Sequence, residues 1–96
     1  MDFILSDEAR SDLIDIQDYI AQNSPRQAAR VIDDIFATLD KLATNPMIGH
    51  VREDLTSRPV RFFSVHSYLI IYNAASRPLS IVRILSGYRD VAILLE

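Results

Sequence analysis

The stretch LSDEARSDLIDIQDYIAQNSPRQAARVIDDI, residues 5–35, decides the fold, because its apolar residues recur at the spacing of two successive helices. In the first half the steps between them are four, three and four, which places them on one helical face: Ala9, Leu13, Ile16 and Ile20. Ser6 is a candidate N-cap, and Asp7 and Glu8 follow in the first turn, where the helix dipole favours negative charge. The pattern predicts a helix over residues 7–22.

A second helix follows after the polar segment Asn23-Ser24-Pro25. Ser24 is suited to cap it, and Pro25 suits the first helical position because that position needs no backbone donor. The helical spacing continues to about residue 44 at these apolar positions: Ala28, Val31, Ile32, Ile35, Leu39 and Leu42. Because only a short turn separates the two helices, we expect them to form an antiparallel hairpin.

The residues on either side of the helices predict strands. Residues 2–5 form a short apolar segment before the first helix, and Asn45-Pro46 ends the second. A loop with Gly49 as its flexible point then runs to Ser57. Three apolar runs of strand length follow: residues 59–65, 67–72 and 79–86. Their connections are short, so we expect antiparallel pairing. The predicted fold class is α+β, with an N-terminal strand and an antiparallel helix hairpin packed on an antiparallel β-sheet.

Both faces of the predicted sheet carry apolar side chains. In the middle run two sets of residues alternate: Tyr68, Ile70 and Tyr72 on one side, and Leu69 and Ile71 on the other. The helix hairpin covers one of these faces. We expect residues 91–95 either to fold across the second face or to leave it open for a partner.

Length, charge and cysteine content limit the functional classes. The 96 residues suffice for one domain with a modest core, and the absence of cysteine excludes disulfides, thiolate metal sites and a cysteine nucleophile. The net charge is −3. Nine acidic and four basic residues lie in the first fifty positions, whereas six arginines and four acidic residues follow. This asymmetry predicts two faces with different partners, and the acidic total argues against coating nucleic acid. Without a signal peptide or an apolar run of membrane-spanning length, we expect a cytoplasmic protein.

Four motifs, in order, resemble the ParE-type toxins of the RelE/ParE superfamily. The first is Ala-x-x-Asp-Leu-x-x-Ile-x-x-Tyr-Ile, from Ala9 to Ile20, and the second is Leu-x-x-x-Pro-x-x-Gly, from Leu42 to Gly49. The stretch RPVRFFSVHSYLIIYN resembles the family's Arg-x-Phe-x-Val and Tyr-Leu-Ile-x-Tyr strands. The stretch IVRILSGYRDV is similar to its closing strand and Gly-x-Arg-Asp tail. The resemblance spans essentially the whole chain and implies a single ParE-like toxin domain over residues 1–96.

The resemblance implies the toxin of a type II toxin–antitoxin pair. Its partner is then a ParD-like antitoxin, a ribbon-helix-helix DNA-binding dimer whose extended C-terminal segment wraps the toxin. The toxin would reach DNA only through that antitoxin. ParE-type toxins are best known as inhibitors of DNA gyrase, whereas RelE-type relatives cleave mRNA in the ribosome. We expect no cofactor, no metal and no membrane partner.

Chemistry on RNA would require proton-transfer groups and cationic stabilisers close together. The residue types that qualify are these: Arg61, His66, Tyr68, Tyr72, Arg83, Tyr88 and Arg89. However, the sheet region contains no lysine, and a net charge of −3 is poorly suited to docking on ribosomal phosphate. We therefore expect a non-enzymatic toxin with no catalytic residues. The alternative is a RelE-type, ribosome-dependent mRNA endonuclease, and a third hypothesis is a harmless toxin fold that acts as a co-repressor with its antitoxin.

Four residues are candidates for binding the target or the antitoxin: Arg61, Arg83, Tyr88 and Arg89. Arg83 lies in a strand that is apolar on both faces, so its guanidinium must pair, reach solvent or contact a partner. Arg61 shares this ambiguity, and Arg89 has a local ion pair with Asp90 as its alternative role.

The remaining polar and aromatic residues are expected to have ordinary roles. His50 and His66 are expected to be surface histidines, and the tyrosines to pack: Tyr19, Tyr68 and Tyr72. The acidic residues of the first helix are expected to form a solvated helix face, because ligands from one exposed helix rarely enclose a divalent cation.

Overall fold

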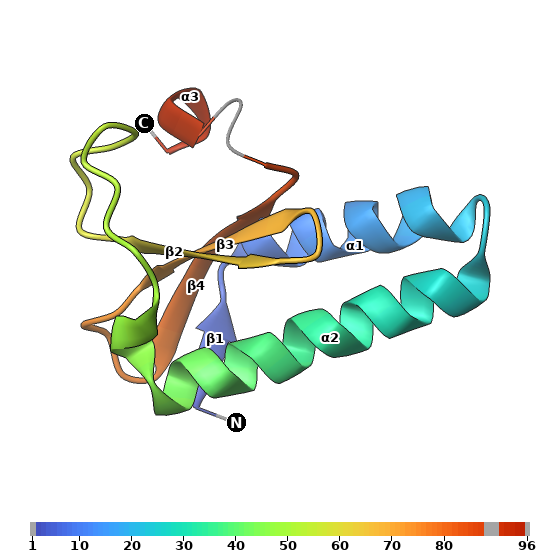
Figure 1. Cartoon of the computed structure of the whole chain (residues 1–96), viewed down its shortest axis with the longest axis horizontal. Coiled ribbons are helices and arrows are strands. Elements are labelled where there is room, and N and C mark those ends of the chain that lie inside the picture. Colours follow the sequence, from blue (N-terminus) through green and yellow to red (C-terminus); the bar gives the residue numbers. More distant parts are fainter. Residues whose placement is uncertain (1, 88–90, 96) are drawn as a thin grey trace.

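In the computed structural model, which describes residues 2–87 and 91–95, a four-stranded sheet lies between a helix hairpin and a short C-terminal helix (Figure 1). The elements are, in order, β1 (Phe3–Leu5), α1 (Asp7–Ala21), α2 (Pro25–Thr44), the 3₁₀ turn η1 (Pro46–Ile48), β2 (Arg61–Val65), β3 (Tyr68–Asn73), β4 (Leu79–Leu85) and α3 (Val91–Leu94). The predicted α+β fold is confirmed, and each predicted helix and strand boundary is met within two residues.

Serine hydroxyls cap both long helices, as the sequence predicts. Ser6 Oγ accepts a hydrogen bond from the backbone N–H of Ala9 at 2.9 Å, and Ser24 Oγ accepts one from Gln27 at 3.1 Å. Each bond satisfies an N–H that has no partner within its helix. Most of the predicted apolar faces is buried: Ala9, Leu13 and Ile16 in α1, and Ala28, Val31, Ile35, Leu39 and Leu42 in α2. Ile20 and Ile32, also predicted for these faces, are half-buried.

Tyr19 departs from the expectation that it packs, because it is 70% exposed. At 100° per residue it lies about a quarter turn from the centre of the face that α1 buries. Its neighbour Ile16 is in that face and is only 8% exposed. The prediction that Tyr19 packs is therefore wrong, because it rested on the apolar residues next to Tyr19 in the sequence and not on its position around the helix.

The strand order is β1-β4-β3-β2. The strand β3 pairs antiparallel with both β2 and β4, as expected for strands joined by short connections. The first strand, β1, pairs parallel with β4, so the sheet is mixed. No tight turn links β1 to β4, because the helix hairpin and two strands lie between them in the chain. The expected antiparallel pairing therefore holds only among β2, β3 and β4.

Two hydrophobic clusters lie on opposite faces of the sheet. The first packs the helix hairpin against Ile70, Tyr72 and Ile84. The second joins Leu69 and Ile71 to Phe62 and Val60, and to two residues of the C-terminal segment, Val91 and Leu95. The alternation predicted for β3 is therefore confirmed, and the C-terminal segment folds across the second face (Figure 1).

Beyond the end of β1, the backbone groups at the edge of β4 bond to Ser6 and to the Asp12 carboxylate of α1 instead of to a strand. Ser6 donates its backbone N–H to Ile81 O at 3.0 Å and its hydroxyl to Val82 O at 2.7 Å. Further along, Asp12 accepts the backbone N–H of Ile84 at 2.9 Å. The same carboxylate accepts two bonds from Arg83, at 2.8 and 2.9 Å, so one side chain holds both the backbone and a side chain of β4.

Replacing Asp12 by alanine is expected to destabilise the fold by about 3 kcal/mol, because it leaves a guanidinium and a backbone N–H largely buried without partners. The Arg83 and Asp12 side chains are only 19% and 12% exposed. Urea unfolding of Asp12→Ala against the parent chain measures this loss.

Asp18→Ala serves as the matched control, because Asp18 is an exposed aspartate of the same helix. Its unfolding free energy should stay within about 0.5 kcal/mol of the parent. The double variant Asp12→Ala/Arg83→Met should lose less stability than the two single losses combined, because it removes both charges together. Equal losses in the Asp12 and Asp18 variants would contradict a structural role for the pair.

Candidate partner-binding site

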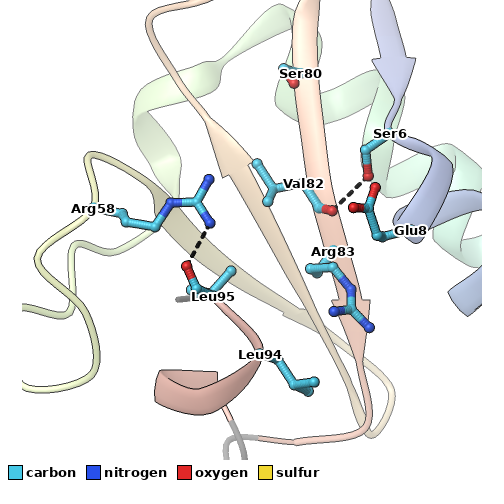
Figure 2. Close-up of a pocket in the computed structure, with 8 residues that line it drawn as sticks. All are labelled: Ser6, Glu8, Arg58, Ser80, Val82, Arg83, Leu94 and Leu95. Atoms are coloured by element: carbon cyan, nitrogen blue, oxygen red, sulfur yellow. Dashed lines mark hydrogen bonds between the residues drawn. The ribbon is translucent and has the colours of Figure 1, made fainter.

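A cavity of about 350 Å³ opens on the second sheet face, between β4 and the C-terminal segment (Figure 2). Its walls come from four parts of the chain: Ser6 and Glu8 at the start of α1, Arg58 before β2, Ser80, Val82 and Arg83 on β4, and Leu94 and Leu95 at the C-terminal end. Residues far apart in the sequence, from the start of α1 to the folded-back C-terminal segment, are needed to form it, so the cavity exists only in the folded chain.

Arg58 is the exposed cation of this cavity. One of its terminal nitrogens donates to the backbone carbonyl of Leu95 at 2.8 Å, which ties the segment before β2 to the C-terminal end. Figure 2 shows its guanidinium turned toward the cavity, with one nitrogen bonded to Leu95 O. Arginine has five N–H donors, so this bond leaves donors for an acceptor that enters the cavity.

Arg83 is the second cation, and it is held in place. The hydrogen bonds that Arg83 donates to Asp12 are the main cause of its raised pKa, and the charges of Asp12 and Glu8 add to the effect. Its charge is therefore largely compensated within the chain. Arg83 shapes the cavity wall, whereas Arg58 supplies the cationic donors that face an incoming group.

The rest of the cavity combines apolar and polar groups. Val82 and Leu95 give apolar surface, and Leu94 at the rim is 42% exposed. Glu8 lies on the α1 side (Figure 2). The arrangement suits a peptide segment that carries both an acidic and an apolar side chain, because guanidinium and apolar contacts are then made together.

Arg61, which the sequence predicts as a binding residue, lies elsewhere and holds a loop. Its guanidinium donates to the carbonyl oxygens of Gly49, at 2.8 Å, and Met47, at 3.4 Å. Directly opposite it in the β2–β3 pair, the Tyr72 hydroxyl donates to Pro46 O at 2.6 Å and accepts the Gly49 N–H at 2.9 Å. Burial raises the pKa of Tyr72, which keeps this hydroxyl a donor.

Gly49 was expected to be the flexible point of the loop, and the structure corrects this. The residue is buried, with an ordinary φ of −72°. A Cβ built there would meet the Tyr72 hydroxyl oxygen at 2.3 Å. The glycine is thus required by a close approach to Tyr72, and the Leu-x-x-x-Pro-x-x-Gly motif marks the loop that Tyr72 and Arg61 hold.

Tyr88 and Arg89 lie outside the described residues and stay predictions. His66 has a positive φ of 53° in the β2–β3 turn, and its Nε2 lies 2.7 Å from a carboxylate oxygen of Asp34 on α2. Within residues 2–87 and 91–95, no group of three or more potential metal ligands occurs.

Sequence reasoning missed Arg58, Ser6 and Glu8 as cavity residues. Ser6 and Glu8 were interpreted through their local helical roles, and the capping role is correct. Nothing near Arg58 in the sequence distinguishes it from other loop arginines. Its role depends on Leu95, 37 residues later, so only the folded chain reveals it.

A mixed sheet with a helix hairpin on one face and a cavity with two arginines on the other defines a small α+β domain. Residues 3–91 match the family described as ParE toxin of type II toxin-antitoxin system, parDE, and the chain belongs to this family. The resemblance noted from the sequence motifs is therefore confirmed.

The fold also matches a solved structure. A chain of the chromosomal ParDE TA system from P. aeruginosa superimposes with a TM-score of 0.74 at 22% sequence identity, over 91% of this chain and 96% of that one. At this identity the likeness concerns the fold. A comparison with curated proteins found no match. In the described part of the chain, no helix combines the length and apolar character needed to cross a membrane.

Gly49→Ala is expected to cost about 2 kcal/mol of stability, because the added methyl group overlaps the Tyr72 ring and hydroxyl. Backbone strain is not the cause, since the φ of Gly49 suits alanine. Thermal and urea unfolding measure the loss.

The control combines this change with Tyr72→Phe, which removes the oxygen that the new Cβ would approach most closely. Tyr72→Phe alone should cost about 1–2 kcal/mol, because two backbone groups lose their partner. The double variant should then lose clearly less than the two single losses combined. Additive losses would show that the contact between Gly49 and the hydroxyl does not limit the site.

Proposed function

We propose that this protein is a toxin that is silenced by a ParD-like antitoxin and that poisons the cell by binding DNA gyrase, without breaking any bond itself. Membership of the ParE family supports the toxin role and an antitoxin partner. The antitoxin would be a ribbon-helix-helix dimer, and the toxin would contact DNA only through it. Because gyrase acts on the chromosome, the proposal places the protein in the cytoplasm.

The observation that carries the antitoxin part of this proposal is the cavity with Arg58 and Leu94 at its mouth. An exposed guanidinium beside exposed apolar surface fits a wrapping segment that carries acidic and apolar residues in alternation. Arg83 would contribute as a fixed wall, and the binding roles of Arg61, Tyr88 and Arg89 are part of the proposal. Arg61 would act indirectly, by holding the loop over residues 46–49.

The charge state of Arg83 argues for binding and against RNA cleavage. A phosphorane intermediate needs cations whose charge is free to meet it. The Arg83 guanidinium is instead bonded twice to Asp12, and the chain as a whole is acidic. No described feature favours the RelE-type endonuclease as a second function.

Two assays separate the candidate functions. The purified chain is expected to inhibit gyrase-catalysed supercoiling in a dose-dependent way and to leave messages intact in an in vitro translation reaction. An added ParD-like antitoxin should restore supercoiling. Message cleavage at ribosomes with normal supercoiling would overturn the proposal. Soluble induction of the gene in its host without a growth defect would favour the co-repressor hypothesis.

Arg58→Gln is expected to weaken antitoxin binding about tenfold, because it removes the exposed charge of the cavity while the amide can still bond Leu95 O. Arg77→Gln is the matched control, because Arg77 is an exposed arginine of the β3–β4 loop that does not line this cavity. Surface plasmon resonance with an immobilised ParD-like antitoxin measures both. Equal weakening by the two variants would show that general charge, and not the cavity, governs binding.

A further inference from the structure

A second cavity, distinct from the one that carries Arg58, lies between α1 and the end of the sheet where β3 begins. Its volume is about 300 Å³, near the lower limit for pockets that hold small groups. It is lined by Asp15, Ile16 and Tyr19 of α1, by Tyr68 at the start of β3 and by Ser86 just after β4. The floor is apolar, since Ile16 is 8% exposed.

Two tyrosines give this cavity aromatic walls that are open to a ligand. Tyr19 is 70% exposed, and Tyr68 is half-buried. Across residues 2–87 and 91–95, neither ring stacks on another aromatic ring, and neither hydroxyl takes part in a hydrogen bond. Burial, together with the nearby Tyr19, raises the pKa of Tyr68, so the Tyr68 phenol stays neutral. Such faces attract cations through the ring quadrupole.

The carboxylate at the edge of the cavity is also available. Asp15 is exposed, and it forms no ion pair with any of the residues that the structure describes. This contrasts with Asp12, one turn earlier, whose carboxylate is fully used by β4. The surface of α1 around Asp15 is acidic, with Arg10 as the only basic residue of the helix.

We propose that this cavity, formed by Asp15, Ile16, Tyr19, Tyr68 and Ser86, receives an arginine side chain of a partner polypeptide. The guanidinium plane stacks on the tyrosine faces and its N–H groups bond Asp15, while the aliphatic stem covers Ile16. An acidic carboxylate beside two aromatic faces fits a cation, and the apolar floor fits the stem of a side chain better than a metal ion. The inference holds whether or not the chain poisons gyrase.

The test uses the full chain and two small probes, N-acetyl-arginine methylamide and its neutral isostere N-acetyl-citrulline methylamide. Backbone amide signals in ¹H–¹⁵N correlation spectra are followed during each titration. The arginine probe is expected to bind with a dissociation constant on the order of a few millimolar, with the largest shifts at residues 15–19, 68 and 86. The citrulline probe should bind at least fivefold more weakly, because it lacks the charge.

Variants then locate the contacts. Asp15→Asn and Tyr19→Leu should each weaken arginine binding about threefold to fivefold. Asp18→Asn is the matched control: it removes the same charge from the same helix at an exposed residue that does not line the cavity, and it should leave the affinity unchanged. The three replaced side chains are exposed, so each variant should stay folded and its spectrum should keep the dispersion of the parent spectrum.

Three outcomes would overturn the proposal. Equal binding of the two probes would show that the positive charge of the probe plays no role. Equal weakening by the Asp15 and Asp18 variants would show that the general negative charge of α1, and not this cavity, attracts the probe. Amide shifts at these residues that appear on concentrating the chain without any probe would instead assign the surface to a second copy of the chain. A failure of the gyrase assay leaves all of these readouts unaffected.

Discussion

The Asp12 carboxylate joins the two layers of this protein, and most of the architecture depends on it. The strand β1 has only three residues, whereas β4 has seven, so a long part of the β4 edge would lack a strand partner. Ser6 and Asp12 satisfy that edge from the start of α1. Because the same carboxylate also binds Arg83, the position of α1 and the orientation of a cavity-lining guanidinium are set by one side chain.

The opposite end of the sheet is held by a second set of polar contacts to backbone. Arg61 and Tyr72 lie opposite each other in the β2–β3 pair, and together they bind the backbone of residues 46, 47 and 49 in the loop after α2. This loop leads into residues 51–60, whose Leu55 and Val60 join the second hydrophobic cluster. The cavity that carries Arg58 therefore depends on polar contacts at both ends of the sheet, and its exposed members are Arg58, Glu8 and Leu94.

The sequence was informative wherever the deciding interactions are local. Helical spacing, serine caps and the length and apolar character of short runs all act within a few residues, and they predicted α1, α2 and the four strands correctly. It was uninformative where the partner is distant in the chain. Asp12 and Arg83 are 71 positions apart and Arg58 and Leu95 are 37 apart, so neither contact leaves a local signal in the sequence. Gly49 was misjudged for the same reason, since the distant Tyr72 limits it. Tyr19 was misjudged for a local one, because it lies about a quarter turn from the centre of the buried face of α1.

The pairing of Asp12 with Arg83 also explains how an acidic chain presents two chemically different surfaces. The acid Asp12 of α1 and the base Arg83 of β4 form an ion pair that is largely buried, so these two charges compensate each other within the fold. What remains exposed on α1 is mainly acidic, with Asp15 and Asp18 beside the single base Arg10, and the second sheet face carries the exposed guanidinium of Arg58 with Glu8 at the α1 side of its cavity. These surfaces complement opposite charges, so a single small partner segment cannot satisfy both through the same side chains. A wrapping partner would need acidic residues for one surface and basic residues for the other, which makes the order of charges along that partner a determinant of specificity.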